Sequence, residues 1–291
     1  MRPEHAGHLA MLTFSMLVAG SFVLGAMAAN DIAPSVLNLV RFWLATVIVG
    51  AIALATSGIP RSAARAPWRY LVLAFFFVTY FVLMFEGLKT AAPVSAGAVF
   101  TLTPILSAGF GYILLRQVMT ARIALALLIG AIGAVWVIFR ADLAALLRFE
   151  IGRGEAIYFI GCVCHAFYAP LVRRLNRGEP VTVFTFGVLL AGSVLLTLFA
   201  GNAALATDWA NMPMIVWITI LYTAVFASAA SFLLLQFAVM RIPASKVMAY
   251  TYLVPSWIIL WELALGGMAP PGLVLVGVGL TILALLLLLK E

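Results

Sequence analysis

The sequence predicts an all-α integral membrane protein with ten transmembrane helices, arranged as two inverted five-helix repeats. Three observations lead to this prediction. Of the 291 residues, 65% are hydrophobic and only 9% are charged, whereas about a quarter of an ordinary soluble domain is charged. Ten apolar runs each have about 20 residues, the length that a helix needs to cross a bilayer. The second half of the chain resembles the first after a shift of about 150 residues.

The few charged residues are predicted to set the topology of the chain. Seventeen Lys and Arg against ten Asp and Glu give a formal net charge of +7. So few charges in so apolar a chain cannot form the continuous basic face that nucleic-acid binding requires. The composition also excludes a soluble globular enzyme. We therefore interpret the basic excess as a membrane-topology signal and expect no nucleic-acid partner.

The first repeat, residues 1–147, is predicted to hold five spans. Its first apolar run is expected to remain as a span, because it lacks a convincing small-residue cleavage site and many similar runs follow. Turn residues precede the second and third runs, at Asn30-Asp31 and at Ser57-Gly58-Ile59-Pro60. The expected limits of the five spans are Gly7–Ala29, Ser35–Ser57, Trp68–Leu88, Pro93–Leu115 and Ala121–Phe139.

The second repeat, residues 148–291, is predicted to hold the other five spans. Asn176-Arg177-Gly178 marks the break after the sixth run, and Pro270-Pro271 marks the break before the tenth. Backbone groups in lipid must be paired within the segment, so each run is predicted to be helical. The expected limits are Gly154–Val172, Thr182–Ala200, Met214–Phe237, Ala244–Gly266 and Pro270–Leu289.

The basic residues predict the orientation, because Lys and Arg collect in cytoplasmic loops. With the N-terminus inside, the cytoplasmic segments hold twelve of the seventeen Lys and Arg, and the outer segments hold four. The remaining one, Arg41, lies within the second span. Both termini are therefore expected on the cytoplasmic side of the membrane.

Two proline pairs align the halves. Pro93 and Pro243 begin the fourth and ninth spans, and Pro104 and Pro255 lie in the middle of the same spans. Each unit has an odd number of spans, so successive units enter the membrane from opposite sides. Inverted repeats recur in secondary transporters, whose substrate site lies near the bilayer midplane between the halves.

Several segments resemble EamA-type members of the drug/metabolite transporter superfamily. They are Gly20-Ser21, Asn38-Leu39-Val40-Arg41-Phe42-Trp43-Leu44-Ala45, Gly87-Leu88 with Ala91-Ala92-Pro93-Val94-Ser95-Ala96, and Thr101-Leu102-Thr103-Pro104-Ile105. The resemblance covers essentially the whole chain and implies a bacterial inner-membrane exporter of small metabolites, amino acids prominent among them. The Gly-Glu pair that this family often has after the fourth and ninth spans is replaced by Arg116-Gln117 and Gly266-Gly267.

Spans four and nine supply the first candidate site residues. Pro104 and Pro255 each remove a backbone hydrogen bond and leave a carbonyl that can face a cavity. Thr101 and Tyr252 share the same helix faces as these prolines. Tight packing between helices is the structural alternative. Glu262 lies within an apolar helix, where a carboxylate is costly, but snorkelling to the nearby outer surface explains it equally well.

Three other spans complete the expected substrate site. Rings that face a cavity suit apolar or aromatic substrates, and hydroxyl groups can bond a carboxylate or an amine. Lipid-facing rings, a core histidine and locally bonded hydroxyls are the structural alternatives. The expected binding residues are Phe77 and Tyr80 in span three, His165 and Tyr168 in span six, and Ser228 and Ser231 in span eight.

Other polar groups receive different interpretations. Cys162, Cys164 and His165 point to different faces of one helix, so no metal site is expected, and nothing indicates another cofactor. Glu86 has Lys89 three residues on, the spacing of a local ion pair. Arg41 can meet an anionic group of a substrate or lipid, or it can hold a helix end.

These features predict a secondary transporter that works by alternating access through a central cavity, with no enzymatic step. Small amphipathic metabolites are the expected substrates, and amino acids are the main expected class. Aromatic and other apolar amino acids would suit the predicted aromatic rings. The alternatives are a nucleotide-sugar or drug carrier of the same architecture, an intramembrane lipid enzyme, and a pore. Glu262, Glu86 and His165 are the groups that could couple transport to protons, and facilitated diffusion is equally open.

Overall fold

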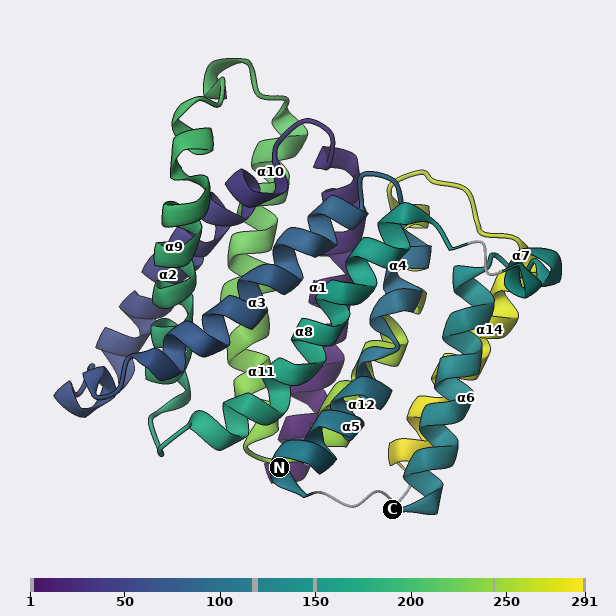
Figure 1. Ribbon diagram of the computed structural model, residues 1–291, viewed down its shortest axis with the longest axis horizontal. Coiled ribbons are helices and arrows are strands. Elements are labelled where there is room, and N and C mark those ends of the chain that lie inside the picture. The colour runs from purple at the N-terminus through teal and green to yellow at the C-terminus, as the bar shows by residue number, and fades with distance from the viewer. Residues whose placement is uncertain (1–2, 117–119, 149–150, 243, 290–291) are drawn as a thin grey trace.

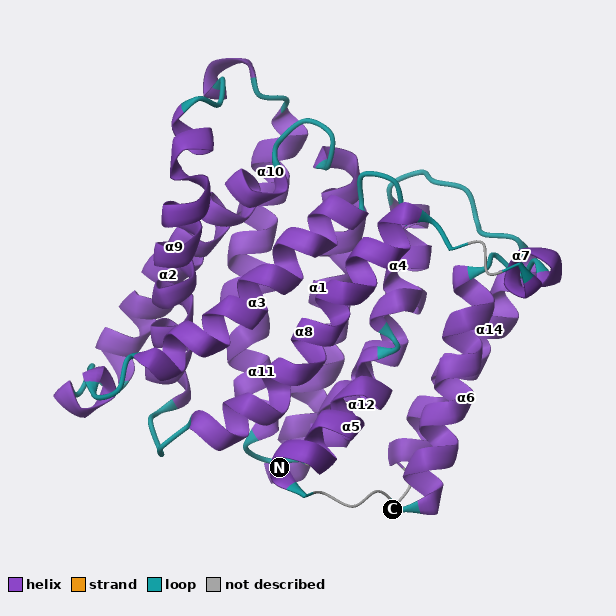
Figure 2. Ribbon diagram, in the orientation of Figure 1, coloured by secondary structure: helices purple, strands orange, loops and turns teal. Residues whose placement is uncertain are grey.

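The structure is a computed structural model that describes residues 3–116, 120–148, 151–242 and 244–289. Within those ranges the chain forms helices joined by loops and contains no strand (Figure 2). Ten helical segments are long and apolar enough to cross a membrane. The predicted all-α class and its ten spans are therefore confirmed. Five residues behind the sequence interpretation lie outside the described ranges. They are Gln117, Pro243 of the aligned proline pairs, and three of the counted charges, Arg2, Glu150 and Lys290.

The spans of the first half agree with their predicted limits to within a few residues. The fourth span, predicted as Pro93–Leu115, has the same outer limits in the structure. A short 3-10 helix, η1 (Arg61–Ala64), lies in the loop before the third span. The helices are α1 (Pro3–Ala28), α2 (Pro34–Thr56), α3 (Trp68–Gly87), α4 (Pro93–Phe100) with α5 (Thr103–Leu115), and α6 (Ala121–Ile138).

The second half begins after a short helix, α7 (Leu143–Leu147). Its seventh span is longer than predicted, because α9 continues through Gly201-Asn202 to Leu205. Glycine costs a helix only about 1 kcal/mol, so one such residue does not end a long apolar helix. The helices are α8 (Arg153–Leu175), α9 (Val181–Leu205), α10 (Met214–Ala224) with α11 (Ser231–Val239), α12 (Ala244–Ala249) with α13 (Val254–Ala264), and α14 (Gly272–Leu289).

The fourth and ninth spans are interrupted at their internal prolines. α4 ends at Phe100, and α5 begins with Pro104 in its first turn. In the ninth span a 3-10 turn, η4 (Tyr250–Leu253), precedes α13, which has Pro255 in its first turn. Proline has no N–H to donate to the preceding turn but fits the start of a helix. Each proline therefore begins the second half of its span.

The eighth span contains an irregularity that the sequence analysis did not predict. Between α10 and α11 lies a π-helical segment, η3 (Val225–Ala230). The backbone N–H of Ser231 bonds there to the carbonyl of Phe226, five residues earlier. Such π segments are rare and occur often at functional sites.

Contacts between the spans follow a regular pattern. α6 packs on α14 at one edge of the molecule, and α2 packs on α9 at the opposite edge (Figure 1). Between these pairs, α3 contacts α8, and α1 contacts both α11 and α13. The contacts have equivalents in the other half, where each span corresponds to the one five places along the chain. The contact between spans three and six (α3 and α8) corresponds to that between spans eight and one (α11 and α1). In the same way, the contact between spans four and six (α5 and α8) corresponds to that between spans nine and one (α13 and α1).

The α6–α14 contact depends on two glycines. A Cβ added to Gly133 would lie 2.6 Å from the carbonyl oxygen of Gly277, and one added to Gly277 would lie 2.7 Å from that of Gly133. Both distances are far below van der Waals contact. The two backbones therefore approach as closely as in other small-residue contacts between membrane helices.

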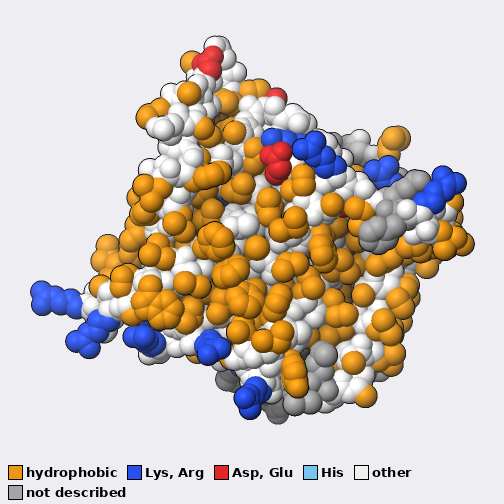
Figure 3. Space-filling model, viewed as in Figure 1, with side chains coloured by type: hydrophobic (Ala, Val, Ile, Leu, Met, Phe, Trp, Pro, Cys, Tyr) orange, Lys and Arg blue, Asp and Glu red, His pale blue; other side chains and the backbone are white. Residues whose placement is uncertain are grey.

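Charged side chains lie toward the two ends of the helices. Figure 3 shows a broad hydrophobic band across the molecule, with Lys and Arg along its lower edge and both signs of charge along its upper edge. The N-terminal end of α1 and the C-terminal end of α14 lie toward the lower edge (Figure 1). The arrangement is that of a protein embedded in a bilayer.

Candidate functional site

A small cavity lies where the middle parts of four spans meet, and we call it the central cavity. It has room for about one water molecule, so the spans pack closely around it. Its lining comes from α1, α3, α8 and the eighth span. The lining residues are Phe14, Val18, Ser21, Phe77, Tyr80, Phe81, His165, Ala227, Ser231, Phe232 and Leu235.

Aromatic rings form one wall of the central cavity. Phe77 lies at the middle of the cluster, with ring centroids 4.2 Å from Phe232 and 4.4 Å from Tyr168. The ring of Tyr80 is 4.5 Å from that of His165 and 4.6 Å from that of Phe81. Such close rings favour apolar and aromatic groups through stacking and burial. The wall is thus suited to the side chain of an apolar substrate.

Most polar groups around the cavity already have partners. The Tyr158 hydroxyl donates to that of Tyr80 at 3.1 Å, and Ser21 donates to the carbonyl of Val18 at 2.6 Å. By contrast, Nδ1 of His165 is buried and has no hydrogen-bond partner among the described residues. Buried polar atoms are nearly always paired, so an unpaired one in a cavity wall is a candidate ligand contact.

The structure brings part of the predicted site together. Phe77, Tyr80, His165 and Ser231 line the central cavity. Tyr168 lies behind that lining, where its ring stacks on Phe77 and its hydroxyl accepts a hydrogen bond from Gln236 at 3.3 Å. These five residues come from α3, α8 and α11, so spans three, six and eight converge as the sequence analysis expected.

The predicted residues of spans four and nine lie elsewhere. Thr101 is buried and donates to the carbonyl of Ala98. The Tyr252 ring packs against Gly130 of α6, and its hydroxyl has no partner among the described residues. Pro104 and Pro255 are buried at the starts of α5 and α13, outside the cavity lining. These four residues thus contribute to helix packing in this conformation.

The two intramembrane carboxylates also lie away from the central cavity. Glu262 is half-buried near the C-terminal end of α13, and its carbonyl accepts the backbone N–H of Gly267 at 2.8 Å. Glu86 forms the expected ion pair with Lys89, at 2.7 Å. No group of three or more His, Cys, Asp or Glu side chains in the described ranges is placed to hold a metal ion.

Arg41 has a more central position than its sequence context showed. Its side chain is fully buried, with Nε donating to the Ser228 hydroxyl at 2.6 Å and Nη2 donating to the carbonyl of Ala227 at 2.9 Å. Nη1 donates to Oδ1 of Asn38 at 3.4 Å. The guanidinium carbon lies 3.8 Å from the centre of the Phe81 ring. Ser228, a predicted site residue, thus contacts Arg41 and not the cavity.

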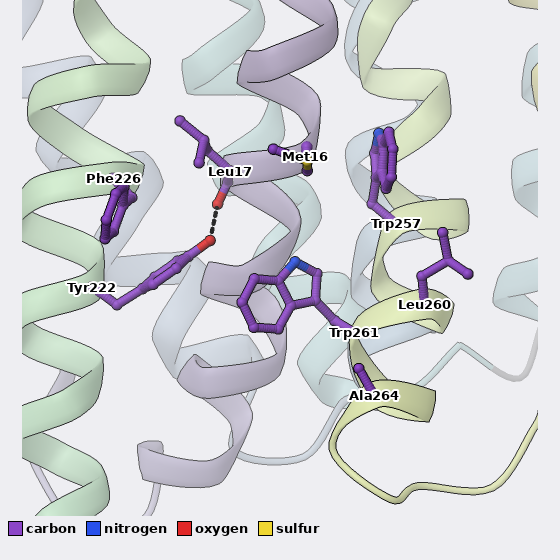
Figure 4. Close-up of a pocket in the computed structure, with 8 residues that line it drawn as sticks. All are labelled: Met16, Leu17, Tyr222, Phe226, Trp257, Leu260, Trp261 and Ala264. Carbon is purple, nitrogen blue, oxygen red and sulfur yellow. Dashed lines mark hydrogen bonds between the residues drawn. The ribbon is translucent and has the colours of Figure 1, made fainter.

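Further hollows lie outside the centre, and two of them have contrasting linings. One is apolar and lies between α1, the eighth span and α13, with Trp257, Trp261 and Phe226 in its walls (Figure 4). Its Tyr222 hydroxyl donates to the carbonyl of Leu17 at 2.9 Å. The other is polar and lies at the end of the molecule that holds the N-terminus. It is lined by Glu4, His5, His8, Arg241, Ile242, Lys246, Tyr250 and Leu289.

Comparisons with known proteins agree with this architecture. The sequence profile of the EamA-like transporter family matches residues 5–139 and again residues 152–290. The chain is 29% identical over 262 residues to the uncharacterized transporter YyaM of Bacillus subtilis (strain 168), which covers 89% of this chain and 86% of that protein. A crystal structure with 22% sequence identity superimposes with a TM-score of 0.74 over 99% of this chain and 98% of the other.

Proposed function

The chain belongs to the EamA-like transporter family, and from this premise we propose that it exports small metabolites across the bacterial inner membrane as a secondary transporter. Amino acids with aromatic or other apolar side chains are its proposed main substrates. The observation that carries this proposal is the ring-lined central cavity at the meeting point of spans one, three, six and eight. A cavity there is accessible alternately from two sides when the helices around it rearrange.

Two inverted repeats, residues 1–147 and 148–291, are the proposed moving units. The family profile matches one segment in each half, and the contacts between spans are preserved when each span is exchanged for the one five places away. Both observations support a pseudo-twofold relation between the halves. Rocking of one unit against the other would open the central cavity to each side in turn, with no covalent step.

Both termini are proposed to face the cytoplasm. Twelve of the seventeen Lys and Arg lie on that side in the predicted topology. The concentration of basic side chains near the end that holds both termini supports this orientation (Figure 3).

Transport assays on purified protein in proteoliposomes test the proposal. We expect saturable counterflow of labelled phenylalanine, leucine or tryptophan, because exchange of a bound solute identifies a carrier. Unidirectional flow that does not saturate would indicate a pore. Counterflow of nucleotide sugars without any amino acid would refute the substrate assignment in favour of the related carrier.

Proton coupling is tested in the same vesicles by imposing a pH gradient. If Glu262 carries the proton, the gradient accelerates wild-type transport and Glu262→Gln abolishes that acceleration. Glu86→Gln is the matched control, because Glu86 already forms an ion pair with Lys89. Transport that ignores the gradient in all three proteins would indicate facilitated diffusion.

A further inference from the structure

We propose that Arg41 is the specificity-determining residue of the central site and that it binds the carboxylate group of the substrate. This inference rests on the proposed function and makes it more specific. The substrate must carry an anionic group next to an apolar or aromatic one. Sequence analysis left the role of Arg41 open, and the structure now favours a ligand role for four reasons.

The first reason is the uncompensated charge. Arg41 is 0% exposed, and it forms no ion pair with any acidic residue in the described ranges. A buried cation is costly unless an opposite charge lies beside it. The charge is therefore compensated only when an anion enters from outside.

The second reason is a contrast within the chain. Arg69 is equally buried, at 1% exposure, but it donates to Oε1 of Glu179 at 2.7 Å. It also donates to the carbonyl of Leu175 at 2.7 Å. The fold thus supplies a carboxylate for the buried guanidinium of Arg69, near the helix ends, and none among the described residues for that of Arg41, inside the second span.

The third reason is the unused hydrogen-bonding capacity of Arg41. A guanidinium has five N–H groups. Ser228, Ala227 and Asn38 each accept one of them, which leaves two N–H groups without an acceptor among the described residues. The bond to Asn38 is long, at 3.4 Å. Arginine binds carboxylates through two parallel N–H groups, so the donors that a carboxylate needs are present.

The fourth reason is the position of Arg41 against the cavity wall. The guanidinium contacts Phe81 and Ala227, and both of these residues line the central cavity. Ala227 and Ser228 belong to the π segment of the eighth span. Phe81 also joins the ring cluster, with its centroid 4.9 Å from that of Phe77. When the carboxylate of a substrate binds Arg41, the apolar part of that substrate therefore lies beside the rings.

A purely structural role would predict something different. Arg41 links span two to span eight, but a neutral side chain such as Gln can link the same helices by hydrogen bonds without a buried charge. A structural link would affect the binding of all ligands alike. A carboxylate-binding role predicts a selective effect on ligands that have a carboxylate.

The test compares each carboxylate with its neutral amide. We would measure half-saturation of thermal stabilisation in detergent-purified protein with phenylalanine against phenylalaninamide, and with leucine against leucinamide. Wild-type protein should prefer each carboxylate by about 10- to 100-fold, the range for a charge-assisted bidentate contact. Arg41→Gln should remove this preference while the affinity for the amides changes by less than about threefold.

Two further variants keep the test decisive. Arg41→Lys retains the charge without the planar fork and should reduce the preference by about tenfold, which provides a reading even if Arg41→Gln does not fold. Arg69→Gln, the matched control, should melt at a lower temperature and keep the full preference.

An equal affinity of wild-type protein for carboxylates and amides, or a preference that survives in both Arg41 variants, would overturn the inference and leave the proposed transport intact. Absence of binding by every compound would refute the proposed substrate class as well.

Discussion

Two glutamates of this chain form ion pairs of the same length in different surroundings, and their replacement gives a sharp test of the structure. Oε1 of Glu179 lies 2.7 Å from Nη2 of Arg69, with side-chain exposures of 8% and 1%. Oε2 of Glu86 lies 2.7 Å from Nζ of Lys89, with exposures of 39% and 31%. Distance therefore does not distinguish the pairs, and burial does.

The expected cost of Glu179→Gln is about 2 kcal/mol of unfolding free energy. The change removes the anion beside the buried guanidinium of Arg69 and leaves it only carbonyl and amide acceptors. Removing one partner of a fully buried ion pair costs about 3–5 kcal/mol, which is the upper limit here. Glutamine retains one acceptor oxygen, so we take a lower figure. Glu86→Gln should cost less than about 0.5 kcal/mol, because exposed pairs contribute little.

Acid titration provides an independent check on the same pair. Burial acts to raise the pKa of Glu179, but hydrogen bonds from Arg69 and from the backbone N–H groups of Arg177 and Glu179 outweigh it and lower that pKa. A lowered pKa means that the pair stabilises the fold fully above about pH 4.3, the ordinary glutamate value. This stabilisation disappears as the pH falls through the lowered pKa.

The assay is thermal unfolding of the detergent-purified proteins, followed by loss of the monodisperse size-exclusion peak, from pH 7 down to pH 3. Glu179→Gln should melt several degrees below wild-type protein at pH 7 and show a smaller loss of stability on acidification. Equal melting of Glu179→Gln and Glu86→Gln at pH 7 would refute the argument from burial.

Three further outcomes follow from the packing. Gly277→Val places a side chain against the backbone of Gly133 and should lower the melting temperature, whereas Gly279→Val, which meets open space, should not. Phe232→Leu removes a ring 4.2 Å from that of Phe77 and should weaken binding of phenylalanine about 3- to 10-fold more than binding of leucine, measured by thermal stabilisation. Tyr222→Phe removes the hydrogen bond to Leu17 and should cost about 1 kcal/mol in unfolding free energy, with no change in substrate affinity.

The spans could be located from the sequence because each one is a continuous apolar run of neighbouring residues. The interruption of spans four and nine was equally local, since Pro104 and Pro255 cannot donate a backbone hydrogen bond. The π segment at Val225–Ala230 was not predictable, because its residues are ordinary helix formers and the irregular turn becomes visible only in the folded chain.

The candidate site was predictable only in part. Phe77, Tyr80 and His165 were found because bulky and polar residues within apolar helices are conspicuous. Tyr252 and Glu262 were equally conspicuous, but Tyr252 lies in η4 and Glu262 in α13, and neither side chain lines the central cavity. Helical spacing shows which residues share a face, and only packing against neighbouring helices decides what that face meets.

The small size of the central cavity has a consequence for proton movement through the protein. A path with room for about one water molecule has no continuous column of water along which protons can hop. Rings of the Phe77 cluster block the space that such a column would need. In this conformation the central cavity therefore offers protons no water-filled route between the described spans, so movement through it requires the helices around it to rearrange.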